Sequence, residues 1–370
     1  MFKFKEYDFK RYNISLLIVT TMLISIGIFL IKQVKPDDYK KQFIGLIGGL
    51  FIAGVMSLID YHFISKFFIV FYLINLVLLV LVKLIGVNHH NAQRWLDLKL
   101  FELQPSELSK IILIIFFAKL FTIFEHKINN VFFLLISIIL MAIPTFLILT
   151  QTDLSTSIVL LTIFVMLIFV AGLSWKIILP ILIVGIPLMI GLFWYVQQDY
   201  QVILSYNQQQ RILSILNPEE YPATMYQQEN SIQAIGSGQL IGKALSEEAL
   251  ELRGYRHVPI AESDFIFAVA GEEFGFIGCS FILFLFAFII YKCLSTAKNA
   301  PDRLGMLIAV GIASMFSFQI FVNIGVVTAI LPNTGIPLPF LSQGLSSLIS
   351  SMMAIGVILN IRLQPKKVRR

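Results

Sequence analysis

The sequence predicts an all-α polytopic membrane protein. Of its 370 residues, 57% are hydrophobic and 33 are Phe, and the mean hydropathy is +0.84. A soluble chain of this length would expose far too much apolar surface. The apolar runs are long enough for membrane helices and too long for barrel strands. The net charge of +6 is modest, and membrane topology and anionic lipid headgroups explain it better than nucleic acid does.

Apolar runs predict about ten transmembrane helices within a single integral membrane domain, residues 1–370. The runs cover about residues 12–31, 43–59, 67–85, 108–124, 131–149, 154–173, 177–196, 265–291, 304–330 and 341–360. The segment that joins the last two runs, LPNTGIPLPFLSQG, contains three prolines and two glycines. This composition predicts rigid, non-helical backbone, which is tolerated at membrane depth only against protein or a wet cavity.

Basic residues predict the orientation of the chain. An even number of spans puts both termini on one side, and the first eleven residues and the tail RLQPKKVRR are both rich in Lys and Arg. Positive charge favours the cytoplasmic side, so both termini are predicted to be cytoplasmic. The long polar segment 197–263, between the seventh and eighth helices, is then extracellular. Within it, YQQENSIQAIGSG predicts an amphipathic helix that ends in a glycine-rich turn, with Gly236 and Gly238 as capping residues.

Asp264 stands where a charged segment meets the eighth apolar run. A carboxylate at such a boundary keeps some hydration but borders a low-dielectric region, which can raise its pKa into the range of a general base. The alternative is structural, because an Asp just before an apolar helix is a common N-cap. From the local sequence alone, the cap is the more economical interpretation.

Three further charged residues lie at the starts of apolar runs. Glu107 and Lys110 in PSELSK are three residues apart, so they share a helix face and can pair, with Pro105 in the first turn. The pair either stabilises a helix start or lines a wet cavity, since charge within a span is costly. Asp153 in TQTDLST is either an N-cap, with Thr152 and Ser155 as local hydrogen-bond partners, or part of a shared polar site.

Arg94 and Trp95 precede the fourth run. The pair fits an interfacial aromatic anchor with a basic neighbour. Alternatively, Arg94 contacts phosphate, because a guanidinium group binds phosphate with two parallel hydrogen bonds.

Five motifs together resemble the SEDS family (shape, elongation, division and sporulation). They are RWLDL with QPSELSK, QTDLSTS, QQRILSILNPEEYP with YQQENSIQAIGSGQLIGKA, ESDFIFAVAGEEFGFIG, and NTGIPLPFLSQGLSS, in the family's order over nearly the whole chain. The third motif resembles the elongation branch most.

The resemblance implies a peptidoglycan glycosyltransferase that polymerises lipid II at the outer face of the cytoplasmic (inner) membrane, with Asp264 as catalytic base. Glu107, Lys110 and Asp153 would be essential polar groups of the same cavity. Its substrates would be lipid II and a nascent glycan strand on undecaprenyl pyrophosphate, surrounded by membrane lipids. A class B penicillin-binding protein, a transpeptidase, would be the activating partner.

Granting this substrate, the chemistry needs positive charge on the leaving pyrophosphate. Arg94, Lys110, Arg211 or a divalent cation such as Mg²⁺ or Mn²⁺ could supply it. No cofactor is certain, and the metal is left open. The alternatives are a lipid II flippase, a structural scaffold for a transpeptidase, and the division or sporulation relatives. A flippase needs a polar path through both leaflets, whereas all four charged residues named at span boundaries map to outer ends.

Overall fold

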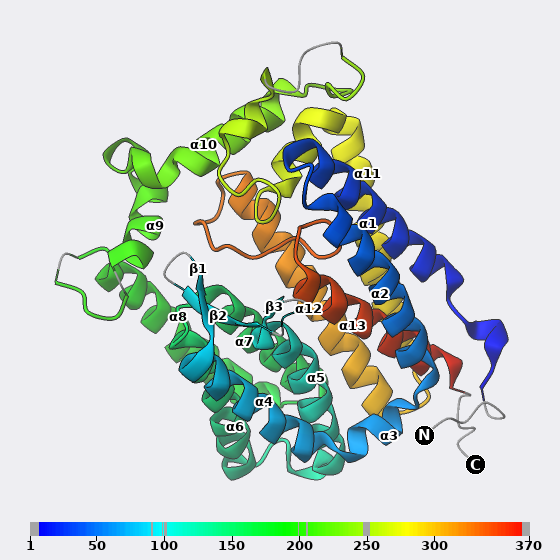
Figure 1. Ribbon diagram of the computed structural model, residues 1–370. Helices are drawn as coiled ribbons and strands as arrows, with labels where there is room; N and C mark the ends of the chain where they lie inside the picture. Colours follow the sequence, from blue (N-terminus) through cyan, green and yellow to red (C-terminus); the bar gives the residue numbers. More distant parts are fainter. Residues whose placement is uncertain are drawn as a thin grey trace.

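The computed structural model is a bundle of long helices (Figure 1). It describes residues 7–89, 92–97, 99, 102–198, 200–204, 206–246 and 252–364. Within this part of the chain, ten helices have 17 residues or more. They are α1 (Ile14–Val34), α2 (Tyr39–Leu58), α4 (Phe68–Ile85), α5 (Pro105–Ile123), α6 (Val131–Leu149), α7 (Leu154–Val170), α8 (Trp175–Val196), α11 (Ile266–Lys298), α12 (Arg303–Val327) and α13 (Leu345–Leu363).

Length and composition make most of these helices membrane spans. Eight of the ten are long and apolar enough to cross a bilayer, and α7 is apolar but slightly shorter, with 17 residues. α5 has 19 residues but is not among the eight, and its sequence includes three charged residues, Glu107, Lys110 and Lys119. The chain is therefore a multi-pass helical membrane protein, as its hydropathy predicts.

The helices alternate in direction, so each loop lies at one of two ends of the bundle. We call the end that holds Asp264 the site end and the opposite end the terminal end. At the terminal end the two termini of the described chain meet, where Asp8 N–H donates to the Leu363 carbonyl at 3.0 Å. α5, α7, α11 and α13 begin at the site end (Figure 1). The site end is at the top of Figure 1, and the first and last described residues lie at lower right.

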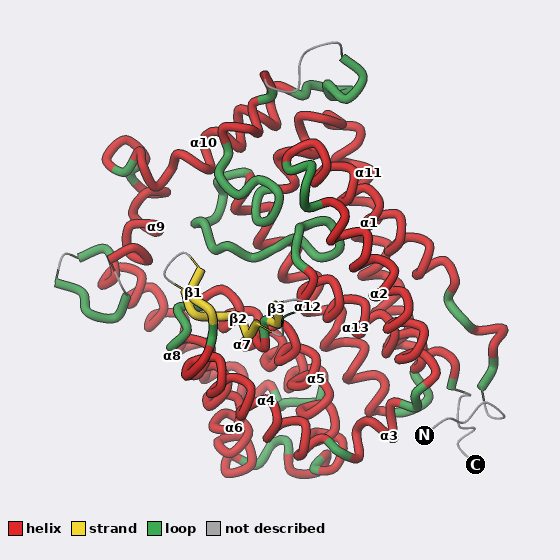
Figure 2. The backbone as a smooth tube through the Cα atoms, viewed as in Figure 1, coloured by secondary structure: helices red, strands yellow, loops and turns green. Residues whose placement is uncertain are grey.

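Shorter elements fill the loops. They are η1 (Phe9–Arg11), α3 (Tyr61–Lys66), η2 (Glu125–Lys127), α9 (Tyr206–Leu216), η3 (Pro218–Glu220), α10 (Pro222–Ser237) and η5 (Gly254–His257). Three short strands were not predicted: β1 (Val87–His89), β2 (Ala92–Asp97) and β3 (Glu102–Leu103), paired antiparallel in the order β1-β2-β3. Figure 2 shows how small this sheet is beside the helices.

The predicted helix in the long loop is confirmed as α10, with Gly238 as its C-cap. α10 packs its polar side chains against the end of α12. Gln228 donates to the carbonyls of Val326 (2.8 Å) and Leu331 (2.9 Å), and Ser231 donates to that of Val327 (2.7 Å). The last carbonyls of a helix have no partner within the helix, so α10 satisfies groups that α12 leaves open and ties the long loop to the bundle.

α11 is two helical pieces joined at Gly275, which has φ 63° and ψ −165°. Only a residue without a Cβ adopts this conformation readily. The Gly238–Ala244 turn lies against the bend: a Cβ on Gly238 would stand 2.0 Å from the Gly271 carbonyl oxygen. Phe276 N–H donates to the Gln239 carbonyl at 2.8 Å. The predicted span that begins near residue 265 is therefore divided: the nine residues before Gly275 form a buried piece of helix, and the apolar helix continues after the bend.

Two adjacent glutamates at this bend are fully buried and neutralised. Glu272 accepts hydrogen bonds from Lys243 Nζ (3.0 Å) and from the backbone N–H groups of Gly254 and Tyr255 (both 2.9 Å). Glu273 pairs with Arg253 Nε at 3.1 Å, and Arg253 is only 2% exposed. We call Lys243, Arg253, Glu272 and Glu273 the buried charge cluster. It holds the loop before Asp264 against α11.

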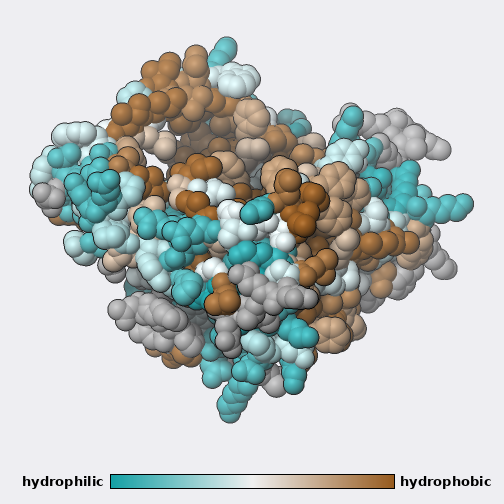
Figure 3. All heavy atoms as spheres, turned by 90° about the horizontal axis from the view of Figure 1, so that it is seen from above, coloured by the Kyte–Doolittle hydropathy of each residue, from teal (hydrophilic) through white to brown (hydrophobic). Residues whose placement is uncertain are grey.

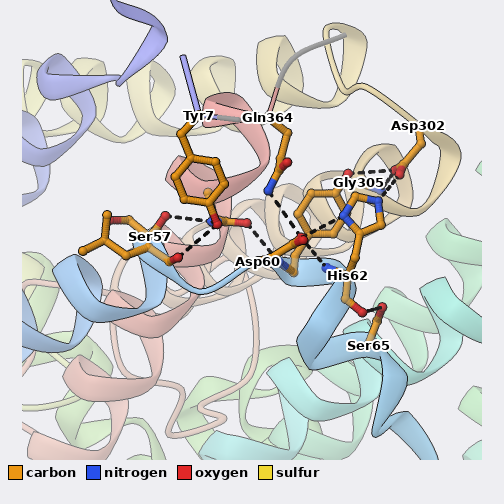
Figure 4. A network of polar contacts seen from close by, with 11 residues as sticks. Tyr7, Ser57, Asp60, His62, Ser65, Asp302, Gly305 and Gln364 are labelled. Atoms are coloured by element: carbon orange, nitrogen blue, oxygen red, sulfur yellow. Dashed lines mark hydrogen bonds and ion pairs between the residues drawn. The ribbon is translucent and has the colours of Figure 1, made fainter. Parts of the chain in front are cut away.

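At the terminal end, His62 bridges two carboxylates (Figure 4). Its Nδ1 lies 2.8 Å from Asp60 Oδ1, and its Nε2 bonds to Asp302. Burial opposes protonation of His62, but its hydrogen bonds to Asp302 and Asp60 outweigh burial and raise its pKa to about 9. Gln364 also donates to Asp60, at 3.3 Å. This network ties the loop after α2 to the start of α12 and to the C-terminal end of α13.

The buried charge cluster makes a stability prediction. Arg253→Gln leaves Glu273 buried with its ion pair removed, which costs about 3 kcal/mol of unfolding free energy. Unfolding of the purified protein in detergent, followed by denaturant titration, measures the loss. The matched control is Lys41→Gln, which removes an exposed partner of Asp38 at 3.1 Å and should change stability by less than about 0.5 kcal/mol. Equal stability of the two variants would show that the cluster does not hold the bend.

Candidate functional site

Asp264 lies between the long loop and α11 and is not a helix cap. The N-cap of α11 is Phe265, and no side chain caps this helix. Asp264 Oδ1 instead accepts a hydrogen bond from Ser263 Oγ at 3.1 Å. The interpretation of Asp264 as a helix cap is therefore wrong, and its carboxylate makes no hydrogen bond to the start of α11.

The environment of Asp264 raises its pKa. Burial is the largest cause, and the nearby carboxylate of Glu262 adds to it. The Ser263 hydrogen bond and the positive charges of Arg94 and Arg211 oppose the rise without cancelling it. A carboxyl group whose pKa is raised by burial while two cations lie nearby has the character of a general base.

Arg94 lies in β2 and reaches the turn that begins α7. Its Nη2 donates to the Thr152 carbonyl at 2.6 Å and its Nε to the Gln151 carbonyl at 3.3 Å, while its Nη1 is 3.8 Å from Asp153 Oδ1. Trp95 follows in the same strand, half-buried, opposite Val87 in the β1 register. β2 thus places the guanidinium group of Arg94 beside the start of α7, and the charge of this group lowers the pKa of Asp264.

Asp153 is the N-cap of α7, as one of the two interpretations predicted. Its Oδ1 accepts from Thr156 N–H at 3.1 Å and its Oδ2 from Thr156 Oγ1 at 2.9 Å. The partners expected from the sequence, Thr152 and Ser155, are wrong: Ser155 Oγ donates to the carbonyl of Thr334. Asp153 therefore stabilises a helix start and also lies beside Arg94.

Arg211 approaches from α9. Its Nη1 donates to the Asn333 carbonyl at 3.2 Å. Burial and the charge of Arg94 lower the pKa of Arg211, and Asp264 opposes this. Arg94, Arg211 and Asp264 thus act on one another electrostatically although they come from β2, α9 and the loop before α11.

Residues 328–344 are non-helical, as predicted, and form one wall of this site. Asn323 Nδ2 donates to the carbonyls of Asp264 and Ile336, both at 2.7 Å. Gly335 has φ +71°, and a Cβ on it would lie 3.3 Å from Asp264 Oδ2. The sequence interpretation missed Asn323 and Gly335, although an Asn inside an apolar span is a signal that could have found the first.

Glu107 and Lys110 form the predicted ion pair. Lys110 Nζ lies 2.8 Å and 2.9 Å from the two carboxylate oxygens of Glu107, and the side chains of Glu107 and Lys110 are 4% and 3% exposed, respectively. Ser350 Oγ donates to the Glu107 carbonyl at 2.8 Å. Among the described residues, neither charged group pairs with Asp264 or Asp153. The pair lies at the site end, and its charges compensate each other.

The face that carries these residues mixes polar and apolar surface. Seen from the site end, hydrophilic side chains gather beside a recess bordered by hydrophobic ones (Figure 3). Among the described residues, no group of three or more His, Cys, Asp or Glu side chains could hold a metal ion. No step of the reaction considered below is routed through a metal ion.

Comparison with known proteins identifies the family. A family model described as "Cell cycle protein", covering FtsW, RodA and SpoVE, matches residues 10–367. The chain belongs to this family. The resemblance to the SEDS family is thereby confirmed.

Named family relatives cover nearly the whole chain. Stage V sporulation protein E of Bacillus subtilis is 34% identical over 94% of this chain and 96% of its own length. Peptidoglycan glycosyltransferase MrdB of Escherichia coli is 34% identical over 87% of this chain and 85% of its own. A probable peptidoglycan glycosyltransferase FtsW of Trichlorobacter lovleyi is 33% identical over 96% of this chain and 94% of its own.

Solved structures of the family share the fold. A chain from work on "Structural coordination of polymerization and crosslinking by a peptidoglycan synthase complex" is 25% identical, with a TM-score of 0.79 over 95% of this chain and 97% of the other. The rod shape determining protein RodA of Thermus thermophilus is 26% identical, with a TM-score of 0.69 over 95% and 96%. The helical arrangement that positions Asp264 is therefore the family fold.

The two contacts of Asp153 can be separated by substitution. Asp153→Ala removes the cap of α7 and should cost about 1 kcal/mol of unfolding free energy, whereas Asp153→Ser keeps an oxygen acceptor and should cost less than about half as much. Denaturant unfolding of both purified variants makes the comparison. If serine costs as much as alanine, the charge beside Arg94, and not the cap, is what stabilises this turn.

Proposed function

We propose that this chain polymerises lipid II into β-1,4 glycan strands at the outer face of the cytoplasmic membrane, with Asp264 as the general base. The observation that carries the proposal is the state of Asp264. Its carboxylate does not cap a helix, burial raises its pKa, and the charges of Arg94 and Arg211 act on it. The name of the MrdB relative, peptidoglycan glycosyltransferase, supports the reaction class.

The chemistry follows from this arrangement. The C4 hydroxyl of lipid II is a weak nucleophile until a base accepts its proton as it attacks. Its oxygen would bond to the anomeric carbon of the lipid-linked donor while the bond from that carbon to the pyrophosphate oxygen breaks. The electron pair leaves with undecaprenyl pyrophosphate, and the proton stays on Asp264. Attack opposite the leaving group inverts the α-linked donor to a β bond, and one base suffices for this scheme.

The leaving pyrophosphate needs positive charge more than it needs an acid. Arg94 and Arg211 both act on Asp264 electrostatically, so they are placed to stabilise charge that develops beside it. Lys110 is a weaker candidate for this role, because Glu107 already neutralises it at 2.8 Å. We assign the remaining polar and aromatic residues to shaping the cavity that holds the substrate: Glu107, Lys110, Asp153 and Trp95.

In the proposed orientation, the site end faces outward, and both termini are cytoplasmic. The charged residues around Asp264 and the Glu107–Lys110 pair all lie at the site end. This placement favours a polymerase over a flippase, which needs a polar path through both leaflets. The whole chain, residues 1–370, would act as one membrane domain, with the loop 197–263 outside.

A class B penicillin-binding protein is the proposed partner. The structural relative from a peptidoglycan synthase complex, in which polymerization and crosslinking are coordinated, supports this pairing. We further assign the chain to the elongation branch, which includes RodA. Identity does not separate the branches, because the sporulation protein and MrdB are both 34% identical to this chain. The RILSILNP segment and the motif that follows it carry the assignment.

The decisive variant is Asp264→Asn, which keeps the shape of the side chain but cannot accept the proton. Loss of a general base should lower the polymerisation rate by about 10² to 10⁴-fold. The measurement is glycan formation from fluorescent lipid II by the purified protein together with its transpeptidase partner. Lipid II binding and thermal stability should stay close to those of the wild type, because the substitution removes no packing contact.

The controls for this experiment are Lys127→Gln, an exposed residue of η2 at the opposite end of the bundle, and the wild-type protein without its partner. Near wild-type polymerisation by Asp264→Asn would remove Asp264 from the base role. Loss of lipid II binding along with the rate would instead assign Asp264 to substrate binding.

The pH dependence of the polymerisation rate tests the electrostatic effect of Arg211 on Asp264. A base works only when ionised, so the rate should rise with pH through the pKa of Asp264, which lies above its ordinary value. Arg211 lowers the pKa of Asp264, so Arg211→Gln should move this acid limb to higher pH, whatever it does to the maximal rate. Rates of the two proteins measured between about pH 4 and 8 give the shift. An unmoved limb would mean that Arg211 does not act on the base.

A further inference from the structure

A polar cavity lies at the terminal end, on the side of the bundle away from Asp264. Its volume is about 260 Å³, and it is lined by Arg11, Thr296, Asn299 and Arg362. These residues come from η1, from the last turn and C-cap of α11, and from the last turn of α13. The cavity therefore forms where three segments far apart in the chain meet.

The lining is cationic. Among the described residues that line it, two are arginines and none is a carboxylate. Arg11 uses its Nε on Asp8 Oδ2 at 3.1 Å, which leaves its two Nη groups. Arg362 makes no hydrogen bond or ion pair with another residue that the structure describes. Two guanidinium groups that share one cavity match the oxygens of a phosphate group.

The other two lining residues leave anion binding to the arginines. Thr296 Oγ1 donates to the Lys292 carbonyl and Asn299 Nδ2 to the Ser295 carbonyl, both at 2.8 Å. A cation near a helix C-terminus can simply balance the helix dipole. That explanation fits Arg362 at the end of α13, but it does not account for Arg11, which belongs to a different segment and lines the same cavity.

Exposed apolar side chains close in sequence to the lining residues indicate the source of the phosphate. Phe9 and Ile14 flank Arg11 in sequence and are 54% and 61% exposed, and Leu294, two residues before Thr296, is 49% exposed. α1 and α11 pack against each other. A ligand with phosphate among the arginines and acyl chains along α1 and α11 would cover both the polar and the apolar surface.

We propose that this cavity binds the phosphate of an anionic phospholipid from the leaflet at the terminal end. Basic pockets between membrane helices are the usual sites for such headgroups. The cavity is separate from the site end, so its occupancy is measurable whether or not the polymerase proposal is correct.

The test compares lipid binding by variants of the full chain. The purified protein in neutral detergent is titrated with phosphatidylglycerol, with phosphatidylcholine as the neutral comparison, and bound lipid is counted by native mass spectrometry. Arg11→Gln and Arg362→Gln should each weaken phosphatidylglycerol binding about fivefold, and together about 25-fold. Phosphatidylcholine binding should not change.

The matched control is Lys127→Gln. Lys127 is exposed in η2 at the same end of the bundle, outside the cavity lining. Its loss removes the same charge and should change phosphatidylglycerol binding by less than about twofold. Equal losses in all three variants, or none in any, would overturn the site. Displacement of phosphatidylglycerol by millimolar inorganic phosphate would assign the cavity to a soluble anion and overturn the lipid. Arg11 is 45% exposed, so Arg11→Gln decides the matter even if Arg362→Gln folds poorly.

Discussion

The position of Asp264 depends on the burial of two neighbouring glutamates, Glu272 and Glu273. A carboxylate without a partner in such surroundings costs several kcal/mol, so both must be met by donors. Lys243, Arg253 and two backbone N–H groups supply them. All of these donors lie on the loop that leads to Asp264. Satisfying the two charges therefore fixes that loop against α11.

Gly275 makes this arrangement sterically available. Its φ of 63° turns the chain so that the first piece of α11 lies against the Gly238–Ala244 turn while the second continues as a span. Asn323 then joins the carbonyl of Asp264 to that of Ile336. Asp264 is thus held from two sides, by the ion pairs of its own loop and by the side-chain amide of Asn323 in α12.

Hydropathy was enough to predict an all-α bundle of long helices and their order along the chain, because water-free surroundings force apolar runs of this length into helices. It failed at the ends. α13 begins at Leu345 and not near residue 341, because the non-helical segment before it is itself apolar, with Ile336, Leu338, Phe340 and Leu341 buried. The strands β1 to β3 were missed since two to six residues give too short a pattern to separate from a loop.

Asp153 and Asp264 show where local sequence stops being informative. Both precede apolar runs, and both resemble caps in sequence. Only Asp153 is one, because Thr156 offers it both an N–H and a hydroxyl three residues on. After Asp264 the helix begins one residue too late for its side chain to serve as the cap, and Phe265 takes that position. The convergence of Arg94 and Arg211 on Asp264 involves three distant segments, which no local pattern encodes.

The non-helical segment 328–344 explains how one oxygen of Asp264 stays available. Three of its backbone carbonyls accept hydrogen bonds from side chains of other elements: that of Asn333 from Arg211, that of Thr334 from Ser155, and that of Ile336 from Asn323. Donors on α9, α7 and α12 thus fix irregular backbone that water would otherwise have to solvate. Ser263 Oγ donates a hydrogen bond to Oδ1 of Asp264. Oδ2 lies beside Gly335, where a Cβ would stand only 3.3 Å from it. A Cβ at position 335 would crowd this second oxygen, which in the proposed reaction is the one that would accept the proton of the sugar hydroxyl.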